Sequence, residues 1–190
     1  MPPSCPTPAG RYRRPGFRPA ALAALLGLAA CDEGPATVTP YMHANGTLEF
    51  LASATRGEGP LYLEINGTPF ADGDTLDARV VAVMEQALQS RVLRLTTDRE
   101  AAEDPEFRLV LVFNPPNSGE LLAFCRRQPA GGPPQPEPRI DLRAGFCRGD
   151  DLLAAVDGWV EEADGPEDER FDQLMHQVIR DIFTRRRRDE

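Results

Sequence analysis

Cysteine and histidine are the residue types that form disulfides, bind structural zinc and act together as a nucleophile and its general base. The sequence has six of them: Cys5, Cys31, Cys125, Cys147, His43 and His176. Structural zinc sites and cysteine catalytic centres are made from these residue types. The chain has neither C-x-x-C nor H-x-x-x-H spacing, which argues against a site that joins the last two cysteines to the histidines. We therefore expect no metal and no cofactor.

The N-terminal segment has the pattern of an export signal. Residues 1–19 carry Arg11, Arg13, Arg14 and Arg18 and no acidic residue, and residues 20–30 are uniformly small or apolar. A basic segment followed by a short apolar run is typical of a secretory signal peptide. The apolar run is shorter than the roughly 20 residues that a membrane-spanning helix needs. Ordinary secretion is the expected route, and the paired arginines leave twin-arginine export as an alternative.

This segment ends in Leu28-Ala29-Ala30-Cys31. The tetrapeptide resembles the lipobox of bacterial lipoprotein precursors, in which leucine, any residue and a small residue precede a cysteine. The resemblance implies that Cys31 is diacylated, that the chain is cut before it, and that Cys31 becomes the first mature residue. It also implies a lipid anchor in the bacterial envelope, facing the periplasm. Asp32 follows this cysteine, and in enteric lipoproteins an aspartate at that place retains the protein in the inner membrane. The choice between inner and outer membrane stays open here. An ordinary signal peptide with a coincidental cysteine is the alternative to the lipobox.

Cys125 and Cys147 are the cysteines left for the folded part of an exported protein. An isolated pair in an oxidising compartment is typical of a disulfide. The two residues flank a proline-rich stretch, residues 128–138, whose ends such a bond would pin together. We therefore predict a Cys125–Cys147 disulfide.

The mature chain is strongly acidic. Residues 31–190 contain 17 arginines, no lysine and 30 acidic residues, which gives a formal charge of −13. A surface of this sign repels nucleic acid, so we expect no nucleic-acid partner. A local exception is the run Arg185, Arg186, Arg187 and Arg188, which could contact phosphate groups or another anionic envelope component. The alternative for this run is a solvated helix end.

Catalytic and calcium-binding patterns fail in detail. Ser118 is not part of a G-x-S-x-G motif, and His176 lies on the polar face of a predicted helix. Residues 72–83 begin like a calcium loop, but Asp77 stands where glycine is required. The acidic residues between 161 and 169 are typical of a solvated turn. We expect a protein without enzymatic activity.

Hydrophobic periodicity places the elements that would hold these residues. Alternating or continuous apolar runs predict strands at 47–53, 61–65, 92–95, 107–113, 120–126, 140–146 and 152–162. Apolar residues at helical spacing predict helices at about 75–90 and 171–183. The predicted organisation is a signal peptide at 1–30, a flexible tether at 31–47 and a single domain at 48–190.

This order of elements predicts an α+β domain with a mainly antiparallel sheet of about four to six strands and two helices packed on one face. The outline is similar, in architecture alone, to small envelope lipoproteins that assist lipopolysaccharide export or activate peptidoglycan synthases. We expect a lipid-anchored envelope protein with a non-catalytic, partner-binding role, its partner being another envelope protein. The alternatives are a small-molecule binding module and a hydrolase whose site is assembled from scattered acids and arginines.

Overall fold

The computed structural model describes residues 34–43, 47–56, 59–71, 75–88, 93–116, 120–126, 131–135 and 139–183. All of them belong to one compact unit, Glu33–Glu190. The predicted lipid site at Cys31, the arginine run 185–188 and Ser118 lie outside the described residues.

One six-stranded sheet organises this unit, in the order β1-β6-β5-β4-β2-β3. Its strands are β1 (Ala36–Met42), β2 (Leu61–Asn66), β3 (Leu95–Thr96), β4 (Phe107–Phe113), β5 (Arg139–Arg148) and β6 (Asp151–Glu161). The α+β class and the number of strands agree with the prediction.

The sheet is mixed, which corrects the prediction of a mainly antiparallel one. β2 runs parallel to both β3 and β4, whereas β4, β5, β6 and β1 pair antiparallel. The helix that follows β2 returns the chain to the end at which β2 begins, so β3 runs parallel to β2. A second return, through η1, does the same for β4. Spacing along the sequence does not reveal strand direction, so the periodicity could not distinguish the two arrangements.

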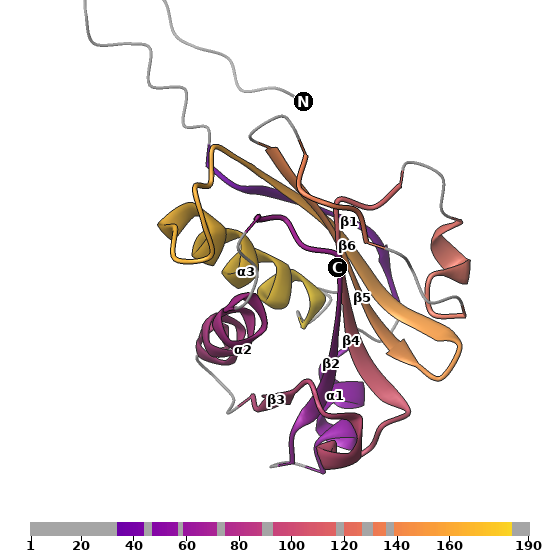
Figure 1. Ribbon diagram of the computed structural model, residues 1–190. Coiled ribbons are helices and arrows are strands. Elements are labelled where there is room, and N and C mark those ends of the chain that lie inside the picture. Colours follow the sequence, from indigo (N-terminus) through magenta and orange to yellow (C-terminus); the bar gives the residue numbers. More distant parts are fainter. Residues whose placement is uncertain are drawn as a thin grey trace, which may run out of the picture. The chain divides into compact units, whose positions relative to one another are not determined.

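The described residues form three α-helices rather than the two predicted: α1 (Leu48–Ala54), α2 (Leu76–Ala87) and α3 (Glu169–Ile182). Two short 3-10 helices, η1 (Arg99–Ala101) and η2 (Leu121–Ala123), complete the fold. Buried side chains from all three α-helices join the main hydrophobic core. Figure 1 shows α2 and α3 together on one face of the sheet, with η2 on the opposite face.

The strongest sequence patterns give the predicted elements. β4 is buried along almost its whole length, as expected for a continuous apolar run. On α3 and its C-cap residue Phe183, the predicted apolar stripe is buried at every position: Phe171, Leu174, Met175, Val178, Ile179, Ile182 and Phe183. Polar contacts join α3 to its neighbours. Arg79 of α2 lies 2.6 Å from the carboxylate of Asp172 on α3, and Thr37 Oγ1 of β1 donates to Asp181 of α3 at 2.6 Å.

Two of the predicted strands are not strands. Residues 47–53 were expected to extend, but 48–54 form α1, which buries Leu51 and Ala54 at helical spacing. Residues 120–126 were expected to pair next, but they form η2 and a turn. Both edges of β4 are already occupied, by β2 and β5, so the chain that leaves β4 has no free edge beside it.

The predicted tether is wrong for residues 36–42. These residues form β1, which pairs antiparallel with β6. Their own burial pattern is weak, with three consecutive exposed positions in the middle. The free edge of β6, rather than local hydrophobicity, therefore explains why this segment is extended and paired.

Candidate functional site

The sheet face opposite α2 and α3 carries a second, smaller core. Its buried residues are Val110, Val112, Phe124, Cys125, Cys147, Leu152 and Ala155. Cys125 follows η2 and is bonded to Cys147 of β5, with Cα atoms 5.8 Å apart, so the predicted disulfide is present. The disulfide fixes residues 120–126, which we call the η2 segment, against this face.

Gly145 of β5 permits the close contact beneath the η2 segment. A Cβ atom at this position would lie 2.5 Å from the ring of Phe124, a distance that the packing does not allow. The absence of a side chain therefore lets the aromatic ring lie directly on the strand. Together, the disulfide and this contact place the η2 segment on the sheet.

Arg108 of β4 positions the same region through its guanidinium. Nη1 donates to the carbonyl of Gly149 at 2.9 Å, and Nη2 donates to the carbonyl of Cys125 at 2.5 Å. Its Nε lies 3.6 Å from the carboxylate of Glu64. Gly149 belongs to the tight turn between β5 and β6 and has a φ of +53°, which favours glycine. Arg108 thus ties this turn and the η2 segment to the central strand.

A pocket of about 430 Å³ lies where the η2 segment, the β5–β6 turn and the ends of β1 and α1 meet. Its volume is within the range of about 300–1,000 Å³ that is usual for ligand sites. The lining combines apolar or aromatic side chains (Tyr41, Phe50, Leu122, Leu152 and Leu153) with ionisable ones (His43, Arg126, Arg148, Asp150 and Asp151).

Four of these charged side chains form no ion pair with another described residue: Arg126, Arg148, Asp150 and Asp151. Arg148 and Asp151 are direct cross-strand neighbours, yet the guanidinium of Arg148 lies over the ring of Phe107, 5.5 Å from its centre. Both signs of charge are therefore presented to the pocket without being neutralised by an ion pair within the described part of the chain.

The charges elsewhere on this face neutralise each other. Arg143 Nε donates to Asp157 at 2.6 Å, and this hydrogen bond raises the pKa of Arg143 above its usual value despite partial burial. Arg139 lies 2.8 Å from Asp141 and stacks over Trp159 at 5.3 Å from the ring centre. The pocket differs from this neighbouring surface because its charges are open to a ligand.

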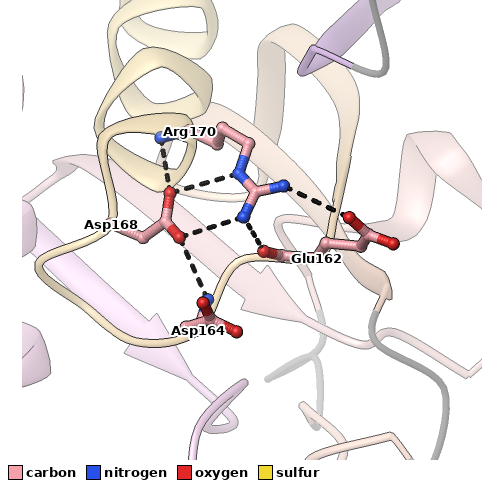
Figure 2. A network of polar contacts seen from close by, with 4 residues as sticks. All are labelled: Glu162, Asp164, Asp168 and Arg170. Atoms are coloured by element: carbon pink, nitrogen blue, oxygen red, sulfur yellow. Dashed lines mark hydrogen bonds and ion pairs between the residues drawn. The ribbon is translucent and has the colours of Figure 1, made fainter.

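The acidic cluster predicted as a solvated turn contains the N-cap of α3 (Figure 2). The carboxylate of Asp168 accepts hydrogen bonds from the backbone N–H groups of Arg170 at 2.8 Å and Asp164 at 3.1 Å. The guanidinium of Arg170 lies 3.3 Å from the same carboxylate and also donates to the carbonyl of Glu162. Burial alone raises the pKa of Asp168, but the hydrogen bonds and the attraction of Arg170 outweigh it and lower the pKa overall. This cluster stabilises the helix and offers no open site.

Replacement of Asp168 by asparagine is expected to remove the pH-dependent part of this stabilisation. Because folding lowers the pKa of Asp168, its charge stabilises the fold fully above the unfolded-state pKa of about 3.9 and less as the pH falls below it. Asparagine keeps the cap but lacks the charge that attracts Arg170 and the helix N-terminus, so we expect Asp168→Asn to cost about 0.5 kcal/mol near neutral pH, with a difference from the wild type that shrinks towards pH 2. Urea unfolding across this pH range measures it.

Asp164→Asn is the matched control, since Asp164 contributes its backbone N–H rather than its carboxylate to the cap. The control should unfold like the wild type. A penalty for Asp168→Asn that is constant over the whole pH range would contradict the assignment.

The structure brings together some of the predicted residues and adds others. Cys125 and Cys147 directly precede Arg126 and Arg148, which line the pocket. His43, assigned to the tether by the sequence, also lines it, with its ring edge-on to Phe50 and the ring centres 5.1 Å apart. His176 lies on α3 and is not in the pocket lining. Cys125 and Cys147 are bonded to each other, so neither has a free thiol that could bind a metal together with the histidines. Over the described residues, no group of three or more His, Cys, Asp or Glu could hold a metal, and no helix there has the length and apolarity to cross a membrane.

The charged residues of the pocket were missed by sequence reasoning. Arg148, Asp150 and Asp151 surround the turn next to Cys147, so a dense group of charges beside a predicted disulfide was the available signal. Arg126 has the same relation to Cys125. Only the fold shows that these two groups face one cavity.

Comparison with known proteins identifies no family. No family model matches the chain, and no curated protein is significantly similar to it in sequence. Among solved structures, the PelC dodecamer from Paraburkholderia phytofirmans matches with 9% identity and a TM-score of 0.44, covering 80% of this chain and 99% of that chain. A point variant of the same PelC gives the same values. A likeness at this level carries no argument about the function of this chain.

Proposed function

We propose that this protein is a lipid-anchored lipoprotein of the bacterial envelope that faces the periplasm and binds a partner protein without catalysing a reaction. The observation that carries the proposal is the sequence Leu28-Ala29-Ala30-Cys31 at the end of an export signal. The Cys125–Cys147 disulfide supports it, because such bonds persist in oxidising compartments.

The short distance from anchor to fold supports a role at the membrane surface. β1 begins at Ala36, five residues after Cys31. Five residues of chain span at most about 18 Å, so a lipid on Cys31 would keep the domain and its partner close to the bilayer. The arginine run 185–188 remains a predicted contact for an anionic partner.

The pocket supports binding rather than nucleophilic chemistry. Its described lining holds His43 but neither serine, threonine nor a free cysteine that this histidine could activate. A small-molecule binding module is the second candidate, favoured by the pocket's volume of about 430 Å³.

Replacing Cys31 by serine is expected to release the protein from the membrane. The sulfur of Cys31 is the atom that would carry the lipid. The described residues contain no helix that could hold the protein in the membrane in its place. In fractionated cells, we expect the wild type in the membrane pellet with a lipid mass on the peptide beginning at Cys31. We expect the Cys31→Ser protein in the soluble fraction.

Cys5→Ser is the control, because Cys5 lies within the segment that is cut away and should behave as the wild type does. An unlipidated wild type, or a Cys31→Ser protein that stays in the pellet, would count against the anchor.

A further inference from the structure

At the pocket, the start of β6 has an edge that no described residue pairs with. β1 pairs with β6 as far as Met42 opposite Ala154, and the N–H of His43 then donates to the carbonyl of Leu153 at 2.8 Å. Asp151 and Leu152 continue β6 and pair with β5 on one side, but no described residue pairs with their other side. Both residues line the pocket. The pocket therefore follows the line along which β1 would continue.

An unpaired strand edge is suited to an extended peptide, whose backbone can add to the sheet by hydrogen bonds. The outer edge of β1 is a poorer site, because Pro40 lacks an N–H and the β1–β6 register shifts between Val38 and Tyr41. The part of β6 whose outer side has no partner among the described residues is Asp151 and Leu152, so it accommodates two or three residues of peptide rather than a long strand.

The side chains around this edge match the end of a peptide. Arg126 and Arg148 can bind a carboxylate through paired hydrogen bonds. Asp150 and Asp151 can accept hydrogen bonds from the backbone N–H groups of the peptide residues that precede this carboxylate. Leu122, whose side chain is 55% exposed on the η2 segment, offers an apolar surface for a terminal side chain.

We propose that the pocket binds the C-terminal end of a polypeptide, with a free carboxylate and an apolar last residue, as a short strand added to β6. This inference rests on the partner-binding function proposed above, because the natural ligand would be the C-terminal tail of an envelope protein. The binding chemistry itself does not depend on the lipid.

The test uses the full-length chain with Cys31→Ser, so that its outcome is independent of lipidation. Alanyl-alanyl-leucine is titrated by calorimetry and by NMR, and saturable binding with a Kd below about 1 mM is expected. The C-terminal amide of the same peptide should bind about tenfold more weakly, because it cannot form charge-assisted hydrogen bonds with arginine. Amide signals of Asp151 and Leu152 should shift on binding.

Arg126→Gln and Arg148→Gln should each weaken binding about tenfold while leaving the melting temperature close to that of the parent. Arg99→Gln, at an exposed position on η1 outside the pocket lining, is the matched control and should bind normally. Absence of binding by a folded protein, or binding that ignores both the amide and the two pocket arginines, would overturn the proposal. Preference for the free amine alone, without dependence on the carboxylate, would also overturn it. None of these results would bear on the membrane anchor, which cell fractionation tests separately.

Discussion

Ile179→Asp is expected to unfold the domain or to lower its free energy of unfolding by about 4 kcal/mol or more. Ile179 is completely buried in α3, in the core that the helix forms with the sheet. An aspartate there would place a carboxylate among apolar side chains without a partner, and the described residues around this core offer few polar groups to neutralise it. Domains of this size have only about 5–15 kcal/mol of total stability, so the loss would be a large fraction.

Urea unfolding followed by circular dichroism measures this effect. Gln173→Asp introduces the same side chain at an exposed position of the same helix and should change stability by about 0.5 kcal/mol or less. If the two variants unfold at the same urea concentration, α3 does not pack on the sheet and the layered arrangement is wrong.

The double replacement Cys125→Ala and Cys147→Ala is expected to lower the free energy of unfolding by about 3 kcal/mol. The bond closes a loop between residues 22 apart in sequence, and both cysteines are buried in the second core. Its loss frees the unfolded chain and also removes the covalent link that holds the η2 segment. Because Leu122 and Arg126 line the pocket from this segment, peptide binding should weaken together with stability.

Equilibrium unfolding of the oxidised wild type and of the double variant measures the change. Treatment of the wild type with a reductant should reproduce the effect without any substitution. Equal stability of all three samples would show that Phe124 on Gly145 and the hydrogen bonds of Arg108 hold the η2 segment without the disulfide.

The sequence by itself determined those features that depend on local pattern. The stripe from Phe171 to Phe183 repeats at helical spacing, so a helix is the conformation that gathers it on one side. The apolar run 107–113 could be buried only between two covering layers, and β4 has that place. The pairing of Cys125 with Cys147 followed from elimination, because the other two cysteines belong to the N-terminal segment.

The tertiary structure decided what depends on neighbours distant in the chain. Residues 36–42 carry no clear strand pattern and are extended because β6 offers them an edge, whereas residues 120–126 lack such an edge and turn onto the open face. The parallel direction of β2 and β4 follows from two returns of the chain, through α2 before β3 and through the η1 segment before β4. The pocket is likewise a product of the fold, because Arg126 and Arg148 are brought to one cavity by the disulfide and the β5–β6 turn. Periodicity reports which side of an element is apolar, but it holds no information about which distant segment will cover that side.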